Sequence, residues 1–103
     1  MKAMDQLEKQ FTDALLKNLA EAERLTGIKE VRLAEAARER GGAAAVRQML
    51  KRRQMTRQFD ALKQCGRPDL SPEALAVKGK YAPLFSDEEV NLCLSALLEA
   101  GMY

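Results

Sequence analysis

The chain has 103 residues, a formal net charge of +2, and neither His nor Trp. Its 47% hydrophobic and 31% charged residues are typical of one globular domain and exclude a disordered chain. The absence of His removes the commonest general base and metal ligand, which disfavours an enzyme and a metal centre. Aromatic residues make up only 5%, which favours an aliphatic core of closely packed helices over a sheet.

Two helices are expected in the first forty residues. Apolar residues recur with a 3.6-residue period over residues 4–25, which predicts an amphipathic helix that ends at Thr26-Gly27. Leu16 lies off this stripe and is a candidate for contact with a second partner. A second helix is expected over 29–40, ended by Gly41-Gly42. The stripe comprises Met4, Leu7, Phe11, Ala14, Leu15, Leu19, Ala22 and Leu25.

Two further helices are expected in the middle of the chain. The third covers residues 43–53, with Val46, Met49 and Leu50 facing inward. The fourth is expected to be capped by Thr56, because threonine is a good N-cap residue, and to end at Gly66. Phe59 and Leu62 are its predicted inward residues.

The last two helices carry the clearest start signals. Ser71-Pro72-Glu73 predicts a short helix over 72–77, because serine caps a helix and proline suits its first position. Residues 78–85 are expected to form a loop. Ser86 and Glu89 fit a capping box for the last helix, which ends at Gly101. The sequence therefore predicts an all-α fold, a compact bundle of five or six short helices.

Residues 27–103 carry a set of motifs beyond these helix signals. They are Gly41-Gly42, Phe59 with Leu62 and Gly66-Arg67, the segment 69–75, the segment 84–89, and Gly101-Met102-Tyr103. In these motifs the chain resembles a family of small bacterial proteins, with departures at Pro68 and Met102. The resemblance implies a bacterial accessory protein and brings no catalytic residues, because the family has no established activity. The single domain over 1–103 then consists of an N-terminal helix, 1–26, and a family-like helical core, 27–103.

Composition also bears on location and redox state. Two cysteines, Cys65 and Cys93, are too few for a disulfide framework, and the first ten residues have no apolar signal region. The longest uncharged apolar stretch, 90–98, is too short to span a bilayer. We expect a cytoplasmic protein with reduced thiols and no membrane contact.

An enzymatic function is not expected. Ser71 and Ser86 are explained as helix caps, and a Ser or Cys nucleophile would lack a histidine base. Two cysteines 28 residues apart cannot build a four-ligand zinc site without carboxylates. We expect no catalytic residue, cofactor, metal or small-molecule substrate.

The basic run from residue 47 to residue 57 is the leading candidate for a binding surface. Residues 47–83 carry nine basic and three acidic side chains, whereas residues 84–103 carry four acidic ones and no basic one. Such a run can bind nucleic-acid phosphates without a sequence code. A helix-turn-helix fits poorly, because the apolar anchor position after Gly41 falls on Arg47. The predicted phosphate contacts are Arg47, Lys51, Arg52, Arg53 and Arg57.

A protein interface is the alternative. The last helix has a wide apolar surface that includes Leu92, and its start is acidic at Asp87 and Glu88. Together with Leu16, these residues suit a protein–protein adaptor or a homodimer without nucleic-acid contact. A solvated basic face with no partner is the third possibility that the sequence leaves open.

Overall fold

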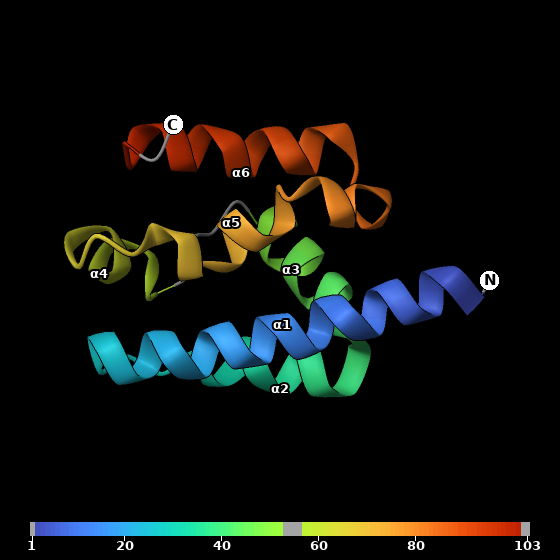
Figure 1. The fold of residues 1–103 in the computed structure, drawn as a ribbon, viewed down its shortest axis with the longest axis horizontal. Coiled ribbons are helices and arrows are strands. Elements are labelled where there is room, and N and C mark those ends of the chain that lie inside the picture. The colour runs from blue at the N-terminus through green and yellow to red at the C-terminus, as the bar shows by residue number, and fades with distance from the viewer. Residues whose placement is uncertain (1, 53–56, 102–103) are drawn as a thin grey trace.

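The structure of the protein is a computed structural model that describes residues 2–52 and 57–101, and it confirms the all-α fold (Figure 1). Over this part of the chain it has six α-helices, two short 3-10 helices and no strand. All six expected helices are present, with ends within three residues of the prediction, although Thr56 lies outside the described residues. The elements are α1 (Lys2–Thr26), α2 (Val31–Arg40), α3 (Gly42–Lys51), α4 (Phe59–Gln64), η1 (Pro68–Leu70), α5 (Pro72–Ala76), η2 (Gly79–Leu84) and α6 (Asp87–Glu99).

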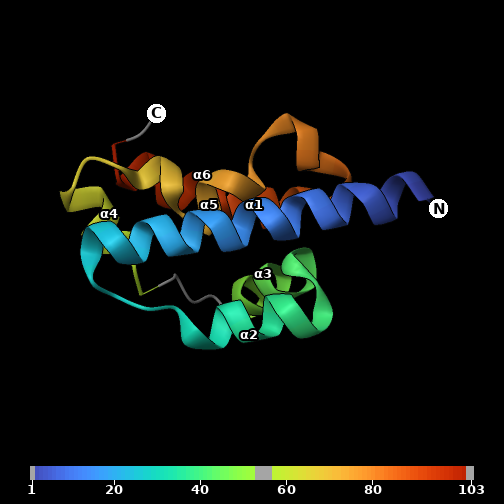
Figure 2. The same cartoon turned by 60° about the horizontal axis from the view of Figure 1, so that its bottom comes forward.

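The long helix α1 is the shared wall of the molecule. Its 25 residues span about 37 Å at 1.5 Å per residue, which matches the longest dimension of the protein, 39 Å. Figure 2 shows α2 and α3 on one side of α1, and α4, α5 and α6 on the other. The helix packs against α2 and α3 as well as against α4, α5, η1 and η2. Because both sides of α1 are covered, most of its apolar stripe is buried.

The apolar stripe of α1 supplies the centre of the core. Phe11, Leu15 and Leu19 are at most 5% exposed and belong to the main hydrophobic cluster. The ring of Phe11 meets Tyr81 and Phe85 edge-on, with centroid distances of 5.0 and 5.2 Å. This geometry suits the charge distribution of aromatic rings. The stripe prediction is wrong at its last residue, because Leu25 is 36% exposed.

Gly41 and Gly42 let the pair of helices α2 and α3 dock closely on α1. Gly41 has a φ of +95°, which favours glycine, and Gly42 is buried. A Cβ atom on Gly42 would lie 2.9 Å from the Cα of Thr12. The backbone N–H of Gly42 donates to Thr12 Oγ1 at 2.7 Å, and that hydroxyl donates to Glu8 O at 2.8 Å. We call α2, Gly41 and α3 the α2–α3 hairpin.

Local capping fixes the C-terminal elements. Ser71 accepts a hydrogen bond from the backbone N–H of Ala74 at 3.1 Å, and Ser86 accepts one from Glu89 at 3.2 Å. The Glu89 carboxylate accepts in return from the backbone N–H of Ser86 at 2.8 Å, so the predicted capping box is present.

The expected loop over 78–85 is largely a 3-10 helix, Gly79–Leu84. The side chains of Tyr81 and Leu84 in this segment are buried, and Tyr81 packs on Phe11. A compact 3-10 segment reaches the core because eclipsed side chains at i and i+3, here Tyr81 and Leu84, point the same way. The segment is too short to show a hydrophobic periodicity that would predict this 3-10 helix from the sequence.

Candidate functional site

The fold divides the basic run between two grooves. Arg47, Lys51, Arg52 and Arg57 are all exposed, whereas Arg53 lies outside the described residues. Arg47 and Lys51 line a groove between α3 and the start of α6. Arg52 and Arg57 line a second groove, between α2 and α3. The predicted phosphate contacts therefore do not form one continuous lining.

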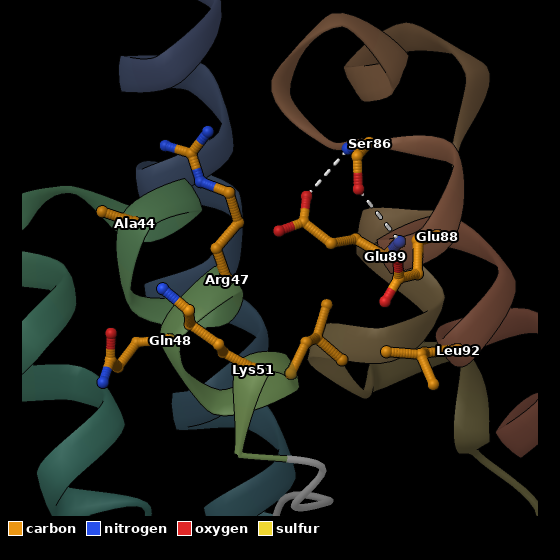
Figure 3. Close-up of a pocket in the computed structure, with 9 residues that line it drawn as sticks. Ala44, Arg47, Gln48, Lys51, Ser86, Glu88, Glu89 and Leu92 are labelled. Atoms are coloured by element: carbon orange, nitrogen blue, oxygen red, sulfur yellow. Dashed lines mark hydrogen bonds between the residues drawn. The ribbon is translucent and has the colours of Figure 1, made fainter.

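The first groove, which we call the α3–α6 groove, has walls of opposite charge (Figure 3). Arg47 and Lys51 project from α3, and Glu88 and Glu89 line the side formed by α6. One guanidinium nitrogen of Arg47 donates to the backbone carbonyl of Leu84 at 3.2 Å, which ties α3 to the end of η2. The groove encloses about 510 Å³. It is lined by Ala44, Arg47, Gln48, Leu50, Lys51, Ser86, Glu88, Glu89 and Leu92.

The second groove, which we call the α2–α3 groove, gathers arginines from separate parts of the chain. Arg32 and Arg40 from α2 line it together with Arg52 and Arg57. Sequence analysis missed Arg32 and Arg40, although the Gly-Gly break after α2 predicts that the two helices fold back on each other. The groove encloses about 830 Å³. Its other lining residues are Glu30, Val31, Leu33, Glu35, Ala36, Glu39, Ala45, Gln48 and Met49.

A buried polar contact holds Arg57 beside the α2–α3 groove. Glu30 is 8% exposed, and its carboxylate accepts from the backbone N–H of Gln58 at 2.7 Å. The fully buried Gln58 amide donates to the carbonyls of Ile28 at 2.6 Å and Leu19 at 3.3 Å. The neighbour of Arg57 is thereby bonded to Leu19 within α1 and to Ile28 and Glu30 in the segment between α1 and α2. No sequence signal identifies this contact, because its partners are 28 to 39 residues apart.

Charge is segregated along the chain and between the layers of the fold. Residues 29–57, which include the α2–α3 hairpin, carry nine basic and three acidic side chains, a net of +6. Residues 58–103, which include α4, α5 and α6, carry four basic and seven acidic side chains, a net of −3. The hairpin itself, residues 31–51, carries five basic and two acidic side chains, a net of +3, and it lies on the side of α1 opposite to α4, α5 and α6 (Figure 2). An electric field of this kind steers charged partners.

The residues of the alternative protein interface lie in two places. Leu16 on α1 and Leu92 on α6 are both half-buried against the main hydrophobic cluster. Asp87 and Glu88 are exposed in the first turn of α6. Leu92 and Glu88 both line the α3–α6 groove, whereas Leu16 does not. The large apolar side chain most exposed on α6 is Leu98, at 57%.

The two thiols have contrasting environments. Cys65 is exposed at the C-terminal end of α4, and Cys93 is buried in the main cluster. Burial, with the nearby carboxylates of Glu73 and Glu89, raises the pKa of the Cys93 thiol from 9.0 to about 12. Cys93 is therefore a neutral thiol at pH 7, which makes it a poor nucleophile and metal ligand.

Neither a metal-binding cluster nor a membrane-spanning helix is found in the part of the chain that the structure describes. Within it, no three His, Cys, Asp or Glu residues are arranged to hold a metal ion. None of its helices combines the length and the apolar character that crossing a bilayer requires.

Comparison with known protein families, with curated proteins and with solved structures finds no match to this chain. The resemblance of residues 27–103 to a family of small bacterial proteins therefore stays a prediction.

Proposed function

We propose that this chain is a non-enzymatic binding protein that holds nucleic acid by its phosphates along the α2–α3 groove. The observation that carries the proposal is the convergence of four arginines on that groove. Arg32 and Arg40 come from α2, Arg52 follows α3, and Arg57 precedes α4. Arginine suits this role, because its planar guanidinium donates two parallel hydrogen bonds to a phosphate and keeps its charge.

The proposed contacts differ from the set expected from the sequence. Arg52 and Arg57 are retained, and Arg32 and Arg40 are added. Arg47 and Lys51 are left out, because Glu88 and Glu89 balance their charge in the α3–α6 groove, whereas the four arginines of the α2–α3 groove outnumber its three carboxylates.

We expect recognition of the phosphate backbone without a preferred sequence. The described aromatic residues, Phe11, Phe59, Tyr81 and Phe85, are all at most 8% exposed. They are therefore not available to stack on the bases of a single strand. A helix-turn-helix insertion is not part of the proposal, because Gly41 alone separates α2 from α3, whereas that motif has a turn of three or four residues. Double-stranded nucleic acid, with its higher charge density, is the expected ligand.

Two carboxylates limit the affinity. Glu35 and Glu39 line the α2–α3 groove and are exposed, so they oppose part of the positive charge. If about three phosphates are neutralised, the logarithmic salt slope is about −2.7, and a fourfold rise in salt weakens binding about 40-fold.

Fluorescence anisotropy with a labelled 20-base-pair DNA duplex tests the proposal, at 50 and at 200 mM salt. We expect binding at 50 mM and about 40-fold weaker binding at 200 mM. The double variant Arg52→Glu, Arg57→Glu should lose binding. The matched control is Lys63→Glu, Lys78→Glu, which makes the same change in net charge on exposed residues outside both grooves and should keep most of the binding.

Two results contradict the proposal. One is the absence of binding at 50 mM salt, and the other is an equal loss in the two double variants, which would reflect net charge alone. In either case a protein–protein adaptor or a homodimer without nucleic-acid contact becomes the better account.

A further inference from the structure

The α3–α6 groove has a basic and an acidic wall that, among the described residues, form no ion pair with each other. Within the described residues, Arg47, Lys51 and Glu88 form no ion pair, and the ion pairs present are Glu21 with Arg24 and Arg67 with Asp69. Among the contacts between described residues, Arg47 also donates to the backbone carbonyl of Leu84. Between the two walls lie the half-buried Leu92 and Leu50, which is only 3% exposed. The order across the surface is therefore positive, apolar, negative.

We propose that this groove is the contact surface of a homodimer, in which a second copy of the chain places its basic wall over the acidic wall of the first. The inference goes beyond the proposed function, because it uses Lys51 and Glu88 rather than the arginines of the α2–α3 groove. It would separate the basic run into a half that contacts the second copy and a half that contacts nucleic acid.

The order of charges is what selects a second copy as the occupant. When two identical surfaces meet about a two-fold axis that runs along the groove, left and right are exchanged. Lys51 of one protomer then faces Glu88 of its partner, and the reverse pair forms at the same time. Two copies of a groove whose walls both carried the same charge would instead repel each other.

The shape of the groove fits the same arrangement. Each groove encloses about 510 Å³ and is open to solvent, so it has room for the long side chains that a facing basic wall would bring. In Figure 3 the amine of Lys51 points away from Leu92 and Glu88, which leaves that amine available to a partner. The acidic first turn of α6 adds Asp87, which is exposed next to Glu88.

The test uses two single variants, Lys51→Glu and Glu88→Lys, alone and as an equimolar mixture. Sedimentation velocity and native mass spectrometry measure the fraction of dimer, against a protomer mass of 11.5 kDa. We expect a dimer for the natural chain and at least a tenfold weaker dimer for each variant alone, because each variant homodimer would place two like-charge pairs in contact. The mixture should recover a heterodimer. In it, one contact joins the two substituted side chains, whose charges are opposite, and the other contact keeps the original Lys51 and Glu88.

Recovery on mixing is the decisive observation. An attraction between Lys51 and Glu88 inside one protomer predicts no recovery, because mixing leaves each chain unchanged. The matched control pair is Lys63→Glu and Glu99→Lys, which changes net charge equally at exposed positions outside the groove and should leave the dimer intact in each variant.

Three outcomes overturn the proposal. The natural chain can be monomeric at every concentration, the mixture can stay monomeric, or Leu98→Asp can dissociate a dimer that Lys51→Glu leaves intact. The third outcome would place the interface on the exposed Leu98 side of α6. Because the duplex-binding test uses Arg52 and Arg57, each proposal can fail while the other holds.

Discussion

The α2–α3 hairpin and the C-terminal elements α5 to α6 are anchored in opposite ways. The described ends of α2 and α3 have no side-chain N-cap, and the hairpin is held by distant residues, with Gly42 bonded to Thr12 and Gln58 bonded to Glu30. Helices α5 and α6 instead begin at serine N-caps, and each serine accepts a hydrogen bond from the backbone N–H three residues later. The comparison teaches that a small helical protein can combine one part ordered by distant contacts with another ordered by local ones. It also sets the order of the mutational effects that we expect.

The largest effect is expected where the hairpin approaches α1. Gly42→Ala places a Cβ atom 2.9 Å from the backbone of Thr12, which α1 cannot relieve without shifting. We expect the free energy of unfolding to fall by about 2 kcal/mol, as for other overpacked core sites. A fall of this size lowers Tm by roughly 10 °C in a chain of this length.

Gly79→Ala is the matched control for that variant. Gly79 has no atom within 4 Å of its Cβ position and no positive φ, so a change below about 0.5 kcal/mol is expected. Urea unfolding followed by circular dichroism measures both variants. Equal losses at the two glycines would mean that the close contact with Thr12 does not anchor the hairpin.

A smaller effect is expected at the start of α6. Ser86→Ala removes the hydroxyl that accepts from the backbone N–H of Glu89, and it keeps the backbone N–H of residue 86 that donates to the Glu89 carboxylate. We expect a loss of about 1 kcal/mol, typical of N-cap serines.

The control for the cap is Ser95→Ala, an exposed serine inside the same helix. Alanine has the higher helix propensity, so this variant should be neutral or slightly more stable. If Ser86→Ala destabilised the protein more than Gly42→Ala, the contrast between distant and local anchoring would be reversed.

The smallest effect is a pH dependence confined to the C-terminal elements. The pKa of the Cys93 thiol is raised from 9.0 to about 12, so its contribution to stability is complete well below pH 9 and is lost as the pH rises through 9 toward 12. At pH 9 the unfolded chain gains about 0.5 kcal/mol by ionising this thiol, while the folded chain does not.

Comparing the natural chain with Cys93→Ala at pH 7 and pH 9 isolates this contribution. The destabilisation caused by Cys93→Ala should be about 0.5 kcal/mol smaller at pH 9, because the variant has no thiol to ionise. Cys65→Ser, at an exposed position, is the parallel variant. A destabilisation by Cys93→Ala that does not change with pH would contradict the burial of its thiol.

The sequence predicts the fold well because its helix signals are local. Ser71, Pro72, Ser86 and Glu89 act on residues within one turn, so their meaning does not depend on the rest of the chain. The sequence does not reveal why Gly42 is needed at the hairpin, since the reason is the backbone of Thr12.

The candidate site is predicted only in part, because contacts between distant parts of the chain bring some of its residues together. Arg52 and Arg57 stand out as members of a run, but Arg32 and Arg40 join them only through the packing of α2 on α3. The run itself hides the division between grooves, because neighbours such as Lys51 and Arg52 point about 100° apart around a helix. A high density of basic residues in a sequence therefore indicates a basic surface, but it does not show which groove each of those residues lines.

The position of α1 between the two parts has a consequence for hydrogen exchange. A backbone amide exchanges with solvent only when its surroundings open, and the layer on either side of α1 can open while the other stays in place. The amides near Phe11, Leu15 and Leu19 are inside a helix whose core-facing side chains stay covered in both partial openings. We therefore expect them to exchange through complete unfolding, so that their protection reports the stability of the whole molecule, whereas the amides of α3 or α6 should report the stability of one layer.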